Sequence, residues 1–75
     1  MQATELVLRI TNSRNMELTV HLEPWGQQHK LTAGASLKIE AKGPDRDDIL
    51  ELEYGDESIT VYGWPGSVVE ISPIE

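Results

Sequence analysis

This chain has no cysteine and no phenylalanine, few basic residues and no long apolar segment. The absence of Cys excludes disulfides, thiolate metal ligands and Cys nucleophiles. Six Lys and Arg residues against 13 Asp and Glu residues leave a net charge of −7, whereas binding to a phosphate backbone requires clustered positive charge. The apolar runs are short, and a membrane-spanning helix needs about 20 apolar residues. We therefore expect neither a nucleic-acid partner nor a membrane partner.

Signatures of catalysis and export are also missing. The 75 residues contain no Gly-x-Ser-x-Gly elbow and no glycine-rich phosphate loop. A chain of this length has too few residues to form a hydrophobic core and also enclose a substrate cleft of roughly 300–1,000 Å³. We therefore expect a non-enzyme without a cofactor. Residues 1–4 have neither the basic nor the apolar part of a leader, which predicts a cytoplasmic location.

What is present is a series of short segments in which apolar and polar residues alternate. A period of two is typical of half-buried strands, and Gly, Pro, Asn and Asp separate the segments at regular intervals. The expected strands are residues 5–11, 17–23, 36–41, 49–54, 58–62 and 67–71, with a shorter seventh at 28–31. This pattern predicts one all-β domain over residues 1–75, an antiparallel sandwich of six or seven strands.

The alternation also predicts the register of one hairpin. Placing Tyr54 opposite Ile59, and Leu52 opposite Val61, keeps the apolar residues on one face and implies a four-residue loop at 55–58. Leu50, Leu52 and Tyr54 are then expected to face the core. That core is small for a chain without disulfides, and oligomerisation is one physical remedy for its thin stability.

Charge is divided unevenly along the chain. Residues 1–44 hold four acidic and five basic residues, whereas residues 45–75 hold nine acidic residues and one basic residue. This imbalance gives the second part of the chain a focused negative electrostatic field, which predicts a non-catalytic interaction module or structural subunit. Its protein partner is expected to present a basic surface to the acidic segment 45–57, which includes Glu51 and Glu53.

Two groups of side chains contain metal-ligand types. Asp45, Asp47 and Asp48, followed by Glu51, could gather oxygens around Ca²⁺, although their spacing does not fit an EF-hand. The simpler interpretation is a solvated acidic loop.

The second group is His21 and Glu23 on one expected strand, with His29 beyond the next turn. These three could bind Zn²⁺ or Cu²⁺ if the turn folds His29 back. The simpler interpretation is a set of exposed polar residues on a half-solvated sheet.

Glu51 and Glu53 are also a candidate acid and base pair, because neighbours on one face of a strand lie about 6.6 Å apart. Glycosidases use two carboxyl groups at comparable separations. Nothing would desolvate either group on a flat outer face, however. We therefore prefer cross-strand pairing with Lys38.

Aromatic residues suggest an alternative function, the binding of a carbohydrate ligand. Trp25 and Trp64 each lie in a turn just after an expected strand. If residues 28–31 form a strand, the strands that end at Glu23 and Tyr62 run the same way and place both Trp turns at one end. Trp25, Trp64 and Tyr62 could then stack on a carbohydrate or form an interface. The interpretation we prefer is that each Trp caps an end of the core.

Several segments resemble cupredoxin-like sandwiches over residues 5 to about 71: Ile10-Thr11-Asn12, residues 18–24, Leu31-Thr32-Ala33-Gly34 and residues 59–64. The resemblance implies a cupredoxin-like or immunoglobulin-like topology. Members of this family bind copper through two His, a Cys and usually a Met near the last strand pair. This chain has no Cys and no His after His29, so it is similar to small bacterial sandwiches of that topology without a type 1 copper site.

An open sheet edge is the expected place of any self-association. The segment 67–71 is short and lies between Pro65 and Pro73, which favours an edge position. The segment 5–11 is the better-guarded candidate edge. We predict that self-association, where it occurs, uses residues 67–71, and that Val68→Lys then yields a folded monomer in sedimentation.

Overall fold

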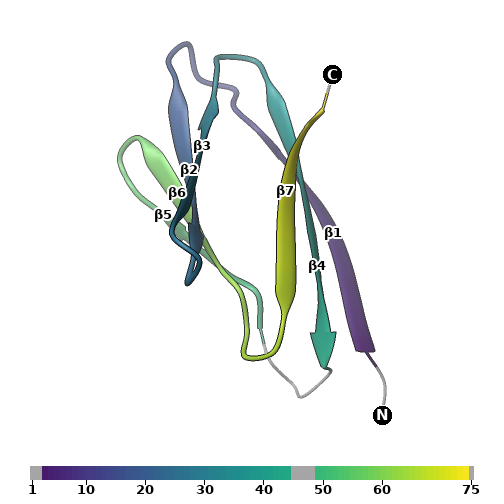
Figure 1. The fold of residues 1–75 in the computed structure, drawn as a ribbon. Coiled ribbons are helices and arrows are strands. Elements are labelled where there is room, and N and C mark those ends of the chain that lie inside the picture. The colour runs from purple at the N-terminus through teal and green to yellow at the C-terminus, as the bar shows by residue number, and fades with distance from the viewer. Residues whose placement is uncertain (1–2, 45–48, 75) are drawn as a thin grey trace.

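The computed structural model describes residues 3–44 and 49–74, and these residues form two β-sheets packed face to face (Figure 1). The strands are β1 (Ala3–Thr11), β2 (Leu18–Glu23), β3 (Gln27–Leu31), β4 (Ser36–Pro44), β5 (Glu51–Tyr54), β6 (Ser58–Tyr62) and β7 (Val68–Ile74). The described residues include no helix that is long and apolar enough to cross a membrane. The all-β prediction is confirmed, and so is its seventh strand.

One sheet has the order β1-β4-β7 and the other the order β3-β2-β6-β5. All strand pairs are antiparallel except β2 with β6, which is parallel. This pair departs from the fully antiparallel expectation. After β3 the chain crosses to the other sheet to form β4, and it returns through β5, so the β5–β6 hairpin brings β6 beside β2 in the same direction.

The core lies between the two sheets. Alternate residues of the central strands point inward, and Val20, Leu22, Ile39 and Val61 are fully buried. The predicted hairpin register is confirmed, since Leu52 pairs with Val61 and, two positions further on, Tyr54 pairs with Ile59.

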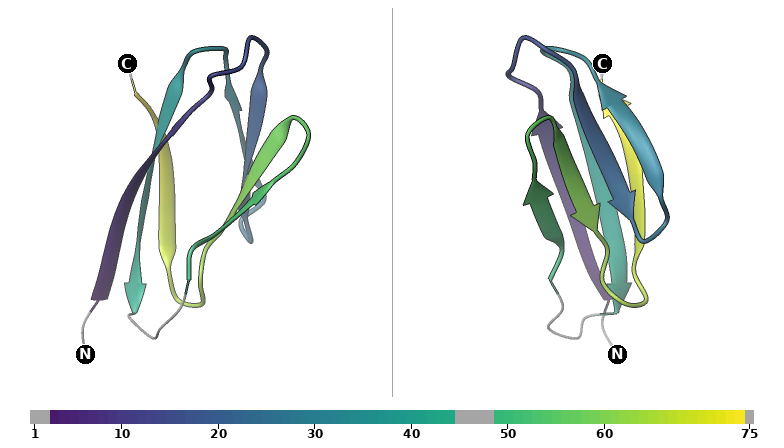
Figure 2. Two further views of the ribbon diagram at one scale, coloured as in Figure 1. Left: turned by 180° about the vertical axis from the view of Figure 1, so that it is seen from behind. Right: turned by 90° about the vertical axis from the view of Figure 1, so that its left-hand side faces the viewer.

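The inward-facing side of β5 is not part of this core, contrary to the sequence-based expectation. Leu52 is 48 % exposed and Tyr54 is 72 % exposed, while Leu50 just before β5 packs partly against the core. The reason is that β5 is the edge of a four-stranded sheet that faces a sheet of three strands. In Figure 2 (left) the β5–β6 hairpin also leans away from β7.

A buried asparagine connects the loops at the opposite end of the sandwich from the tryptophan turns. Asn12 is 1 % exposed, and its side-chain Nδ2 donates to the carbonyl oxygens of Met16, at 2.8 Å, and Leu31, at 3.0 Å. Its Oδ1 accepts a hydrogen bond from the backbone N–H of Arg14 at 3.0 Å. One side chain therefore joins the loop after β1 to the end of β3.

Candidate functional site

The four residues of β5 form the most exposed strand surface of the described chain, and we call Glu51, Leu52, Glu53 and Tyr54 the β5 surface. All four are exposed. The two glutamates point to the outer face of the sheet, and Leu52 and Tyr54 point to the inner face. The β5 surface thus presents carboxylates on one side and uncovered apolar side chains on the other.

The loop that follows β5 is anchored to the rest of the molecule. Arg14 donates from Nη1 to the carbonyl oxygen of Asp56 at 2.7 Å, and the backbone N–H of Thr19 donates to the carbonyl oxygen of Glu57 at 3.0 Å. The side chains of Asp56 and Glu57 remain exposed. These bonds hold the hairpin in place, so the β5 surface is presented by a fixed element rather than by a free loop.

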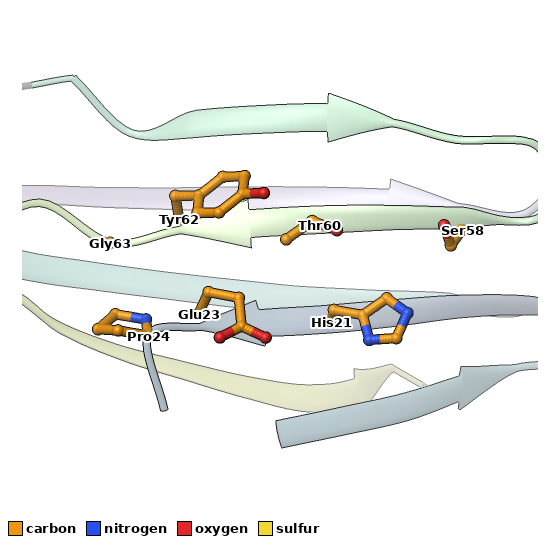
Figure 3. Close-up of a pocket in the computed structure, with 7 residues that line it drawn as sticks. All are labelled: His21, Glu23, Pro24, Ser58, Thr60, Tyr62 and Gly63. Atoms are coloured by element: carbon orange, nitrogen blue, oxygen red, sulfur yellow. The ribbon is translucent and has the colours of Figure 1, made fainter. Parts of the chain in front are cut away.

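A shallow groove lies beside the β5 surface on the outer face of the same sheet (Figure 3). It is lined by His21, Glu23 and Pro24 from β2 and its turn, by Ser58, Thr60 and Tyr62 from β6, and by Gly63 just after β6. Tyr62 donates from its hydroxyl to Oε1 of Glu53 at 2.9 Å. This bond connects the groove to the β5 surface.

That hydrogen bond is the largest cause of a raised pKa of Tyr62, because the protonated phenol donates to a carboxylate. Desolvation and the negative charges of Glu53, Glu51 and Glu23 act in the same direction. We expect Glu53→Ala to lower the pKa of Tyr62 towards the ordinary value of 10.0. Ultraviolet titration of a Tyr54→Phe background, which leaves one tyrosine, measures it. Glu51→Ala is the control and should lower the pKa less, because no hydrogen bond is removed.

The structure does not bring the second metal-ligand candidate together. His29 pairs with the inward-facing Val20, so its side chain lies on the opposite face of the sheet from His21 and Glu23. His29 Nε2 instead lies 3.3 Å from Oε1 of Gln27. Within the described part of the chain, no group of three His, Cys, Asp or Glu side chains is placed to hold a metal ion.

The acidic loop candidate falls mostly outside the described residues. Asp45, Asp47 and Asp48 lie there, and only Glu51 of that group is placed, on β5.

The expected pairing of Glu51 and Glu53 with Lys38 is wrong. Lys38 lies on β4 in the other sheet and is 3.5 Å from Oε1 of Glu40. The sequence pattern could not assign the strands to sheets, because alternation alone does not show which strands are neighbours. Glu53 contacts Tyr62 across the hairpin instead.

The two tryptophan turns meet at one end of the sandwich, as predicted. The backbone N–H of Gly63 donates to the carbonyl oxygen of Glu23 at 3.0 Å. The ring of Trp25 lies so close to Gly63 that a Cβ atom there would be 2.7 Å from Cη2.

Only one of the two tryptophans caps the core. Trp64 is 7 % exposed, and its Nε1 donates to the carbonyl oxygen of Pro44 at 3.0 Å. Trp25 is 44 % exposed, so the expectation that it also caps the core is wrong. The two turns differ because Trp64 enters between the sheets, whereas Trp25 lies over the backbone of Gly63. Trp64 is therefore not accessible for stacking on a sugar.

The predicted edge position of the 67–71 segment is confirmed. β7 is an edge of its sheet, and Val68 is 54 % exposed on the outer face opposite Lys42. β1 is the other edge of that sheet. Self-association through β7 stays a prediction.

Comparison with known proteins returned no match: no protein-family model, curated sequence or solved structure matches this chain. The resemblance to cupredoxin-like sandwiches therefore stays a prediction, and the candidate site is argued from its own geometry.

Proposed function

We propose that this protein is a non-catalytic interaction module that binds a basic protein surface through the β5 surface. The observation that carries the proposal is the exposure of all four β5 residues, with Glu51 and Glu53 on one side and Leu52 and Tyr54 on the other. Carboxylates steer an oppositely charged partner to this place, and the apolar side chains provide area for it to cover.

Charge around the β5 surface supports this choice. Glu51, Glu53, Asp56 and Glu57 are all exposed within the β5–β6 hairpin. The ion pairs among the described residues, Lys30 with Glu17 and Lys38 with Glu40, lie on other elements. Arg14 approaches the hairpin, but its hydrogen bond there is to a backbone carbonyl. The hairpin therefore keeps a negative charge that a basic partner would neutralise.

The experiment is affinity capture with two double variants that carry equal net charge. We expect Glu51→Lys with Glu53→Lys to lose the captured partner. Glu5→Lys with Glu70→Lys, on the outer face of the other sheet, should keep it. Capture by the wild type should fall as the salt concentration rises, because screening weakens exposed charges. Equal capture by both double variants would contradict the proposal.

Carbohydrate binding is the second candidate, favoured by the groove beside β5. Tyr62 offers a ring there, and Ser58, Thr60, His21 and Glu23 offer polar groups. Trp25 is half exposed at the same end of the sheet. The test is titration of the protein with a glycan panel while the fluorescence of Trp25 is followed in a Trp64→Phe variant. A spectrum that no glycan changes would argue against sugar stacking at this end.

A further inference from the structure

Resting on the proposed function, we propose that the basic partner docks as an extended segment that adds an antiparallel strand to the edge of β5 that pairs with no other described strand. The partner segment carries cationic side chains opposite Glu51 and Glu53, and apolar side chains opposite Leu52 and Tyr54. The proposed function requires only that the partner be basic, whereas strand addition also requires backbone hydrogen bonds along the edge.

The backbone groups needed for this docking can be assigned from the hairpin. Hydrogen-bonded and non-hydrogen-bonded pairs alternate along an antiparallel ladder. The N–H of Gly55 donates to the carbonyl oxygen of Ser58 at 2.7 Å, so two positions earlier Glu53 is also bonded to β6, and so is Glu51. Leu52 and Tyr54 consequently direct their N–H and C=O groups away from β6, towards the open edge.

The other side of β6 gives the same assignment independently. Gly63 donates its backbone N–H towards β2, to Glu23 at 3.0 Å. The backbone groups of Ile59 and Val61 then also point to β2, because direction alternates along a strand. Those of Thr60 and Tyr62 point to β5, opposite Glu53 and Glu51. Both sides of β6 therefore leave Leu52 and Tyr54 with outward-directed backbone groups.

Among the described strands, β1, β3 and β7 are also sheet edges, but most of their inward-facing apolar residues pack against the core. Leu31 at the end of β3 is 2 % exposed, and Val69 in β7 is 7 % exposed. The edge strand β5 combines open backbone groups with inward side chains that are exposed by about half or more, Leu52 and Tyr54. An added strand would lie about 4.8 Å beyond β5 and cover these side chains.

The charge of the β5 surface favours a basic segment, rather than a second copy of this chain, as the strand that binds to this edge. Two β5 strands paired antiparallel with matching faces would place Glu51 of each opposite Glu53 of the other or, in the register that pairs Leu52 with Tyr54, the two Glu53 residues opposite each other. Like charges directly opposite each other destabilise a strand pair. Alternating cationic and apolar residues fit both faces of the β5 surface, and antiparallel pairing is the more stable direction per residue.

The probe is a capped peptide, Arg-Val-Arg-Val-Arg, and two N-methylated forms of it with the same charge. In the antiparallel arrangement the N–H groups of the two valines point to β5, and those of the arginines point away. Methylating both valine nitrogens should weaken binding about tenfold or more, since two hydrogen bonds are lost. Methylating the first two arginine nitrogens should leave the affinity within about twofold. Calorimetric titration of the intact protein measures all three.

Amide hydrogen exchange gives a second readout at the docking edge. On addition of the unmodified peptide, the amides of Leu52 and Tyr54 should become protected. Those of Glu51 and Glu53, already bonded to β6, should change little. Equal affinity of all three peptides, loss only on arginine methylation, or no change at Leu52 and Tyr54 would overturn strand addition.

The two proposals fail separately. If the unmodified peptide does not bind, but a partner is captured by the wild type and lost with Glu51→Lys and Glu53→Lys, strand addition is wrong and the interaction function stands. If the double variant also captures that partner, the interaction function itself is wrong.

Discussion

Replacing Asn12 by leucine is expected to lower the free energy of unfolding by about 3 kcal/mol. The substitution removes the donor to the carbonyl oxygens of Met16 and Leu31 and the acceptor for the N–H of Arg14. The leucine side chain is similar in size, so the expected cost comes from backbone groups left without a partner. Urea unfolding followed by tryptophan fluorescence measures the change.

Asn15→Leu is the matched control, because Asn15 is exposed in the same loop. Its effect should stay within about 0.5 kcal/mol. Asn12→Asp should also destabilise the protein, since a carboxylate cannot donate to the two carbonyl oxygens. If Asn12→Leu unfolds at the same urea concentration as Asn15→Leu, the hydrogen bonds of Asn12 do not support the fold.

Trp64→Ala is expected to cost about 3–5 kcal/mol of unfolding free energy, enough to unfold much of a domain this small. The indole is buried at the end of the core, and its removal also leaves the carbonyl oxygen of Pro44 without its donor. Trp25→Ala should cost about 1 kcal/mol or less, because the Trp25 ring is 44 % exposed. Chemical unfolding followed by circular dichroism allows the two variants to be compared without a tryptophan signal.

Milder variants test the same difference in the folded state. In Trp25→Phe the remaining indole is buried, so its emission should lie at shorter wavelength than that of Trp64→Phe. Identical emission maxima would contradict the assignment of Trp64 to the core and Trp25 to the surface.

The strands and the hairpin register could be predicted from the sequence because both depend on neighbouring residues. Alternation places Leu52 opposite Val61 whatever the rest of the chain does. The exposure of Leu52 could not be predicted, because it depends on how many strands form the facing sheet. An apolar residue on an edge strand has the same sequence pattern as one in the centre of a sheet.

The same contrast, between features set by neighbouring residues and features set by how the strands assemble, applies to the candidate site. The acidic character of Glu51 and Glu53 is evident from the sequence, but their distance from Lys38 depends on which strands share a sheet. Residue type alone groups His29 with His21, because both are potential metal ligands. The register of β2 with β3 places the two histidines on opposite faces of the sheet. Residue type does not reveal this arrangement, because it depends on which residues of the two strands pair.

The parallel pairing of β2 with β6 has a consequence for how the molecule is made. Val20 pairs with Ile59 across 39 positions of sequence, so this sheet cannot close until most of the chain has left the ribosome. Long-range pairing of this kind also slows folding. A two-stranded hairpin alone is at best marginally stable in water, so an isolated peptide of residues 51–62 should not reproduce the β5 surface. Recognition through that strand would therefore distinguish the finished protein from its nascent or partly unfolded forms.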